Sequence, residues 1–119
     1  SVARNLLPAA NISPAEWDYA ALVRMDARAR LRMLLPEGTV MCIPTTPFPA
    51  PPCGAPYNEQ HQWRARINCL CSHGGLTGVP QVSIPGAHVG GLPVGLSIIA
   101  RPGDDALLVA TARALELGE

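Results

Sequence analysis

The chain has 119 residues, of which 48% are hydrophobic and 15% are charged, and nine arginines balance nine acidic residues with no lysine present. This length favours one domain, the apolar content excludes intrinsic disorder, and the zero net charge without a basic block disfavours nucleic-acid binding. No signal-peptide-like run or stretch of about 20 apolar residues occurs, so we expect a soluble protein with no membrane partner.

The first predicted element is a helix over residues 14–35. Ser13 and Glu16 have the spacing of a capping box around Pro14, and Pro36 and Gly38 end the helix. An apolar stripe at helical spacing is typical of a helix packed on a core, and here it consists of Trp17, Ala21, Leu22, Met25, Ala29, Leu31 and Leu35.

Residues 39–43, "TVMCI", lie between helix-breaking residues and predict a strand buried on both faces. Residues 44–56 contain six prolines, which fix φ and remove hydrogen-bond donors, so this proline loop is expected to be stiff and to wall a cleft at the end of that strand. Residues 59–73 return to helical spacing, and their predicted apolar face consists of Trp63, Ile67, Leu70 and Cys71.

Two further strands, residues 79–85 and 92–100, predict an antiparallel hairpin joined by the six-residue loop 86–91. A helix separates residues 39–43 from residues 81–84, so we expect these two segments to pair in parallel through a right-handed crossover. The sheet would then be mixed. Three strands make a thin sheet, and we expect further strands to complete it.

A final helix follows Asp104, its predicted cap, and ends at Gly118. Its predicted inward side chains are Leu107, Leu108, Thr111 and Leu115. The order is therefore α-β-α-β-β-α within one segment, residues 1–119, of α/β class with helices on a mixed sheet.

Candidate nucleophiles occur only singly in the sequence. They are Ser83 and Ser97 within strands, Thr45 and Thr46 in the proline loop, and Ser72 beside His73. Adjacent residues on a helix diverge, so Ser72 is interpreted as a surface cap. No pairing of a hydroxyl with a base is predicted.

Four cysteines outside a small secreted framework favour reduced thiols and a cytoplasmic location. A zinc site is the alternative for the segment "CLCSH", which holds Cys69, Cys71 and His73, with His61 and Cys53 nearby. Residues two apart lie on opposite sides of a helix and no second ligand pair follows, so we expect packed cysteines and no metal. The glycine-rich "HGGLTGVP" lacks both nucleotide-binding motifs, and no cofactor is expected.

Trp63 lies between Arg64 and Arg66 on the second long helix. These side chains could hold an anionic or aromatic ligand near the proline loop. Alternate helical positions diverge, so a core tryptophan with solvated arginines is the favoured interpretation.

Three ordered blocks, "VMCIPTTPFPAPP", "RINCLCSHGGLTGVPQVSIPG" and "GLPVGLSIIARPGDDALLVATARALE", resemble the C-terminal third of the amidase signature family of hydrolases. The resemblance covers about residues 31–116, and "LTGVPQVSIP" is most similar to amidases of the indoleacetamide-hydrolase type. It implies a three-layer amidase-type fold.

Members of that family hydrolyse carboxamides with a serine nucleophile, a second serine in a cis peptide and a lysine base. None of these positions maps onto this sequence, and the chain has no lysine, so the resemblance implies a catalytic part that precedes Ser1 and a 119-residue chain that is inactive alone. What the chain would supply is part of a substrate funnel, formed by Thr46, Phe48 and Trp63 around a small-molecule amide. Phe48 could stack on an aromatic substrate or simply pack.

Two hypotheses follow from these patterns. In the first, the chain is the C-terminal part of an amidase and its partner is the remainder of that enzyme. In the second, it is a non-catalytic amidase-like module for binding or assembly, which covers an open sheet edge with a second copy.

Overall fold

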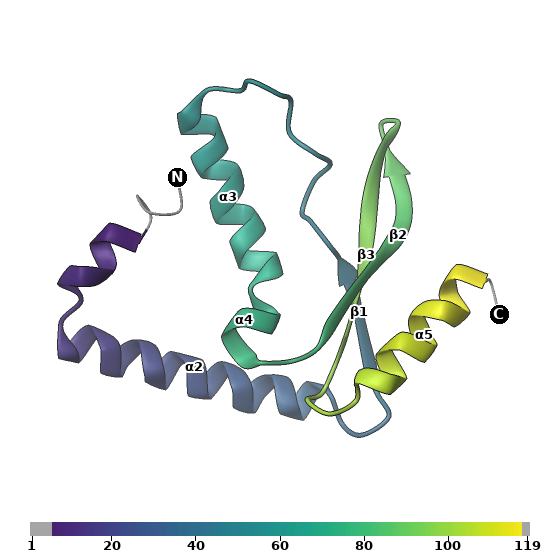
Figure 1. The fold of residues 1–119 in the computed structure, drawn as a ribbon, viewed down its shortest axis with the longest axis horizontal. Helices are drawn as coiled ribbons and strands as arrows, with labels where there is room; N and C mark the ends of the chain where they lie inside the picture. Colours follow the sequence, from purple (N-terminus) through teal and green to yellow (C-terminus); the bar gives the residue numbers. More distant parts are fainter. Residues whose placement is uncertain (1–5, 118–119) are drawn as a thin grey trace.

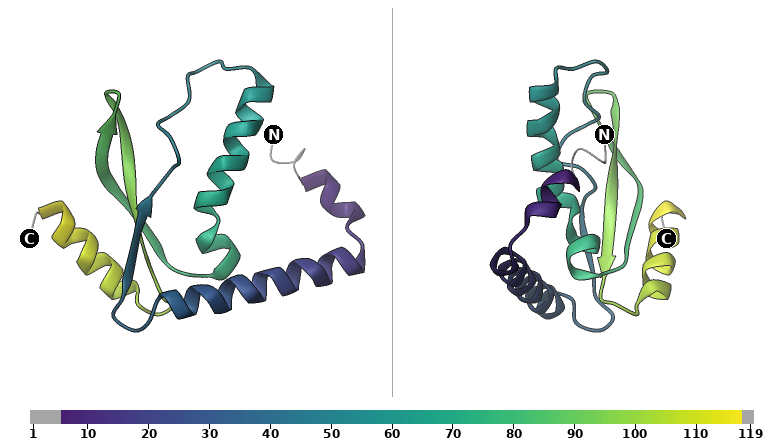
Figure 2. Two further views of the ribbon diagram at one scale, coloured as in Figure 1. Left: turned by 180° about the vertical axis from the view of Figure 1, so that it is seen from behind. Right: turned by 60° about the vertical axis from the view of Figure 1, so that its left-hand side comes forward.

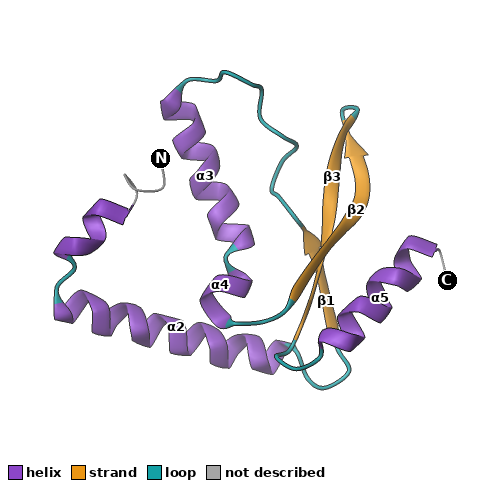
Figure 3. Cartoon of the chain, in the orientation of Figure 1, coloured by secondary structure: helices purple, strands orange, loops and turns teal. Residues whose placement is uncertain are grey.

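Eight elements follow one another along residues 6–117, the part of the chain that this computed structural model describes (Figures 1 and 3). They are the 3-10 helix η1 (Leu7–Asn11), the helices α2 (Pro14–Leu34), α3 (Tyr57–Cys71), α4 (His73–Thr77) and α5 (Asp105–Leu117), and the strands β1 (Val40–Pro44), β2 (Gln81–Val89) and β3 (Leu92–Ala100). In Figure 2, α5 lies on one side of the sheet and the other long helices on the opposite side, which confirms the three-layer α/β arrangement. None of the helices in this described part is both long and apolar enough to cross a membrane.

The N-terminus of α2 carries the predicted capping box. The Ser13 hydroxyl accepts a hydrogen bond from the backbone N–H of Glu16 at 3.3 Å. In return the Glu16 carboxylate accepts from the Ser13 backbone N–H at 2.8 Å and from its hydroxyl at 2.7 Å. Amides that the first helical turn cannot pair are thereby satisfied.

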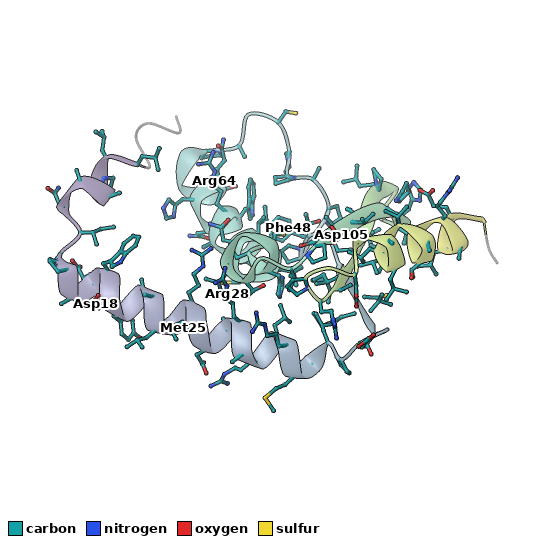
Figure 4. All side chains as sticks on the ribbon, turned by 60° about the horizontal axis from the view of Figure 1, so that its bottom comes forward. Asp18, Met25, Arg28, Phe48, Arg64 and Asp105 are labelled. Carbon is teal, nitrogen blue, oxygen red and sulfur yellow. The ribbon has the colours of Figure 1, made fainter. Side chains whose placement is uncertain are left out.

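Only the C-terminal end of α2 packs against the sheet. Leu31 and Leu35 are 7% and 1% exposed, whereas Trp17 and Met25 are 69% and 65% exposed. The expectation that the whole apolar stripe lies on a core is therefore wrong for the described residues. The reason is the length of α2, which extends well past the sheet, and Figure 4 shows Asp18 and Met25 on the projecting part.

Two arginines of α2 hold the short helix α4. Arg24 donates from Nε to the carbonyl of Leu76 at 2.9 Å and from Nη2 to the carbonyl of Gly75 at 3.2 Å. Arg28 lies between the two helices (Figure 4) and donates to the carbonyl of Thr77 at 3.1 Å. The last carbonyls of a helix have no partner within it, so guanidinium donors at this end satisfy them.

The sheet has the order β1-β3-β2, and both neighbouring pairs are antiparallel. The predicted parallel pairing of residues 39–43 with 81–84 is therefore wrong, and no mixed pairing occurs among the three described strands. The two segments do run in the same direction, but β3 lies between them. The hairpin strand β3 takes the central position because both of its edges are paired, one with β1 and one with β2.

The predicted hairpin of β2 and β3 is confirmed, but its loop is shorter than expected. Gly90 and Gly91 alone form the turn, with φ values of 57° and 79°. Two consecutive positive φ angles are those of a type I′ turn, whose twist matches that of the flanking strands. The remaining loop residues join β2, where the register shifts between Pro85 and Ala87 at a β-bulge.

The core lies on both faces of β3. On the face toward α5, the buried cluster consists of Ile84, Ile98, Ala100, Leu108 and Ala112. On the opposite face, toward the end of α2, the buried cluster consists of Leu31, Leu35, Val79 and Ile99. Successive strand residues point to opposite faces, so the adjacent pair Ile98 and Ile99, each 0% exposed, anchors both clusters.

Strand β1 is less buried than predicted. Cys42 is exposed, so burial of β1 on both faces is not found within the described residues. Helix α5 packs on β2 and β3, which leaves the β1 side of that face uncovered. The same position of α5 buries Leu108 to 1% exposure but leaves Leu115 47% exposed, so the predicted inward direction of Leu115 is wrong.

We expect truncation of Leu108 to destabilise the fold. Its side chain is fully buried between α5 and the sheet, so Leu108→Ala should lower the free energy of unfolding by about 2–5 kcal/mol. The neighbouring Val109→Ala, at a side chain 53% exposed, is the control and should change it by less than about 0.5 kcal/mol. Urea denaturation followed by circular dichroism measures both, and equal effects would contradict this packing.

The capping box should respond to acid. Hydrogen bonds from the backbone N–H of Ser13 and then from its hydroxyl lower the pKa of the Glu16 carboxyl, against a smaller opposing effect of desolvation. A lowered pKa means that the cap's contribution is complete above the pKa of unfolded Glu16 and is lost as pH falls through the folded value.

An NMR titration of Glu16 should therefore have a lower midpoint in the unmodified chain than in Ser13→Ala. Ser72→Ala, which removes a hydroxyl that bonds to the Asn68 carbonyl instead, should leave that midpoint unchanged. A midpoint indifferent to Ser13 would contradict the cap.

Candidate binding site: a hydroxyl cluster beside two cavities

Three hydroxyl groups meet on the face of the sheet opposite α5. Thr45, the first residue after β1, continues the ladder by donating its backbone N–H to the carbonyl of Gly95 at 2.8 Å. Its Oγ1 lies 2.7 Å from Ser83 Oγ on β2 and 2.9 Å from Ser97 Oγ on β3. Thr45, Ser83 and Ser97 thus form a hydroxyl cluster that links all three strands.

Gly95 leaves the space in which the cluster forms. A Cβ atom at this position would lie 2.6 Å from Thr45 Oγ1 and 2.9 Å from Ser83 Oγ, closer than real Cβ contacts allow. Glycine permits this approach because it has no side chain. The second glycine of the "GLPVGLS" block therefore has a direct structural role.

Ser97 ties the cluster to the core. Its side chain is 0% exposed, and its Oγ accepts a hydrogen bond from Gln81 Nε2 at 2.9 Å in addition to its contact with Thr45. A buried hydroxyl without partners would destabilise the fold by about 1–3 kcal/mol, so these contacts make its burial possible.

A cavity of about 280 Å³ opens beside the cluster and is called the Phe48 cavity. Its wall combines the hydroxyl-bearing Thr45, Thr46 and Ser83 with the apolar Phe48, Ile67 and Val94. Two of the three predicted site residues, Thr46 and Phe48, therefore lie at one cavity. Figure 4 shows Phe48 between α3 and the strands.

The proline loop is held in shape around Phe48. Thr46 Oγ1 donates to the Phe48 carbonyl at 2.8 Å, a local bond that closes a turn. The Arg66 guanidinium lies 5.3 Å from the centre of the Phe48 ring, within the range of a cation–π interaction. One face of that ring is thus already occupied by Arg66.

A second cavity of about 340 Å³, the Trp63 cavity, adjoins the first. Trp63, Arg64 and Gln60 of α3 face residues 51–54 of the proline loop across it. Pro51 and Ile67 line both cavities, so all three predicted site residues border one continuous region. Trp63 is half-buried, so it belongs neither to a closed core nor to open surface.

Helix α3 supports this region through Cys71. Its Sγ donates to the carbonyl of Thr45 at 2.9 Å and so holds the start of the proline loop. Cys69 is exposed, and no group of three potential metal ligands occurs within residues 6–117. Cys71 and Cys69 therefore diverge as the helical spacing predicts.

The described walls of both cavities carry hydroxyl and amide groups, one arginine and one thiol, but no histidine or carboxylate. A hydroxyl becomes a nucleophile when a neighbouring base removes its proton. The arrangement is therefore suited to binding and orienting a ligand through hydrogen bonds and apolar contact.

Thr45, Ser83 and Ser97 are expected from the sequence to be isolated candidates, and the structure corrects this. A six-residue loop places Ser83 opposite Val94, whereas the observed glycine turn and bulge place it opposite Ser97. The signal that could have found the pairing is the Gly90–Gly91 dipeptide, a strong two-residue turn signature.

The four cysteines should differ in reactivity. Cys42, Cys53 and Cys69 are exposed, whereas Cys71 is half-buried and donates its thiol proton to the Thr45 carbonyl. Under native conditions a maleimide should label the first three at least tenfold faster than Cys71, as measured by peptide mass spectrometry. In urea all four should label alike, and a fast native reaction at Cys71 would contradict the contact.

Comparisons with known proteins agree with this architecture. The family model described as Amidase matches residues 3–109. Amidase 1 from Oryza sativa subsp. japonica is 39% identical over 92 residues, which are 77% of this chain and 21% of that protein. Amidase 1 from Arabidopsis thaliana is 33% identical over 115 residues, which are 96% of this chain and 27% of that protein.

A second kind of relative and a solved structure are also similar. One component of the glutamyl-tRNA(Gln) amidotransferase from Thermus thermophilus is 34% identical over 102 residues, 86% of this chain and 21% of that protein. The crystal structure of an amidase matches 98% of this chain and 28% of its own chain, with a TM-score of 0.81 and 28% sequence identity. The chain thus spans between a fifth and a third of the length of the proteins that it resembles.

Proposed function

This chain belongs to the amidase family, and from that premise we propose that it forms the C-terminal part of an amidase and one wall of its substrate pocket. In this proposal, carboxamide hydrolysis uses a serine nucleophile, a second serine and a lysine base that lie outside these 119 residues. The substrate is a small-molecule amide, and no metal or cofactor takes part.

The observation that carries the proposal is the pair of adjoining cavities between the proline loop, α3 and the sheet. Their walls offer apolar surface and hydrogen-bonding groups without a general base among the described residues. The sequence contains no lysine, so the base typical of the family has to come from other polypeptide.

The three predicted site residues have distinct roles in this proposal. Phe48 and Trp63 supply flat apolar surface for the part of the substrate next to the scissile amide. Thr46 acts mainly through its bond to the Phe48 carbonyl, which fixes the loop that carries the ring. The finer likeness to indoleacetamide-hydrolase-type enzymes stays a prediction.

Two surfaces suit contact with the remainder of the enzyme. Strand β1 forms an edge of the described sheet, and edge strands tend to pair with further chain. The projecting part of α2 exposes large apolar side chains, among them Trp17, Tyr19 and Leu22. The same edge supports the alternative, a non-catalytic module that dimerises through β1.

To test the proposal, the chain is assayed alone and joined to the polypeptide that its gene encodes upstream, on a panel of aliphatic and aromatic amides. We expect hydrolysis only in the joined form. There, Phe48→Ala should raise KM about three- to tenfold with little change in kcat, because ground state and transition state lose the same contact.

Leu115→Ala, on the far side of the sheet, is the matched control and should leave both constants unchanged. Hydrolysis by the 119-residue chain alone would refute the proposal. A defined dimer in sedimentation, together with no activity in the joined form, would support the non-catalytic module instead.

A further inference from the structure

The hydroxyl cluster holds one more proton than its internal bonds use. Thr45, Ser83 and Ser97 contribute one hydroxyl proton each, and two hydrogen bonds join the three oxygens. Gln81 Nε2 can only donate, so its bond to Ser97 consumes no hydroxyl proton. One proton of the three is therefore left to point outside the cluster.

The environment of Ser97 decides where the surplus proton lies. Ser97 is 0% exposed, and an unpaired proton there would be a buried, unsatisfied donor. Ser97 accepts from Gln81, so its own proton goes to Thr45, its other partner. The surplus proton then lies on Thr45 or Ser83.

Both of these residues line the Phe48 cavity. The cavity wall therefore presents a hydrogen-bond donor whose direction is set by Gln81, through a chain of hydroxyls that polarise one another. The rest of the described wall is apolar or hydroxyl-bearing, and none of its residues is charged. Such a wall suits an uncharged ligand group with one acceptor oxygen beside an apolar body.

We propose that Thr45 and Ser83 form an oxygen-recognising subsite in the Phe48 cavity, which selects neutral ligands with a carbonyl-type acceptor next to a ring or branched alkyl group. Gln81 is a positioning residue that orients the hydroxyl protons without touching the ligand, and Gly95 provides the space. This rests on the proposed function and deepens it by naming how one wall of the pocket chooses its substrate.

Substitution of Gln81 by glutamate separates this subsite from a merely polar wall. An ionised carboxylate accepts only, so Ser97 would donate to residue 81, Thr45 to Ser97, and Ser83 to Thr45. Every hydroxyl proton is then used internally, and the cavity loses its donor while keeping its shape. The double variant Thr45→Val/Ser83→Ala removes the same donor by a different route.

The probes are acetophenone and ethylbenzene, which share a ring and a similar shape but differ in the carbonyl oxygen. Binding to the 119-residue chain at pH 8 is followed by ¹H–¹⁵N NMR, which also reports whether each variant is folded. The unmodified chain should bind acetophenone about five- to tenfold more tightly than ethylbenzene, as one net hydrogen bond allows.

In Gln81→Glu and in the double variant this ratio should fall below one, because a carbonyl oxygen that loses its hydration without a donor binds less well. The control Gln62→Glu, which adds the same charge on the exposed side of α3, should keep the ratio of the unmodified chain.

A ratio of one or less in the unmodified chain, or a ratio unchanged in Gln81→Glu, would overturn the subsite. Because no hydrolysis is measured, the result is independent of the proposed function. Loss of activity in the joined enzyme with the binding ratio intact would point to a failure of the amidase proposal alone.

Discussion

The burial of β3 on both faces is the constraint on which the rest of the fold depends. Ile98 and Ile99 are each fully buried, one against α5 and the other against the end of α2. Full burial of two such side chains stabilises the fold by about 3–6 kcal/mol in transfer free energy. It also fixes the register of β3, since a slip by one residue would reverse every side chain.

That register places the binding site. Along the face of β3 opposite α5, alternate positions read Ile99, Ser97 and Gly95, which change from apolar to hydroxyl to no side chain. The core therefore passes into the hydroxyl cluster and then into the open space that the proline loop borders. The apolar anchor and the polar subsite are consecutive positions on one strand face.

The sequence predicts the elements better than their pairing. Proline and glycine breakers, the capping box of Ser13 and the strand-like run of residues 92–100 are enough to locate helices and strands, because those signals are local. The partner of β1 could not be predicted in this way, because antiparallel pairing with β3 joins residues more than 50 positions apart in the chain. The hairpin loop is four residues shorter than expected, and the longer loop conceals the meeting of Ser83 with Ser97. The exposure of Trp17 depends on how far α2 extends past the sheet, which helical periodicity does not report.

Thr45 is held from three directions, by its backbone N–H to Gly95, its hydroxyl to two serines and its carbonyl to the Cys71 thiol. A residue with so many fixed contacts has little conformational entropy left to lose when a molecule settles against it. The ordering that usually weakens association of small molecules with proline-rich or mobile segments has already taken place during folding. Affinity at this wall is then governed chiefly by the rigidity and hydration of the incoming molecule.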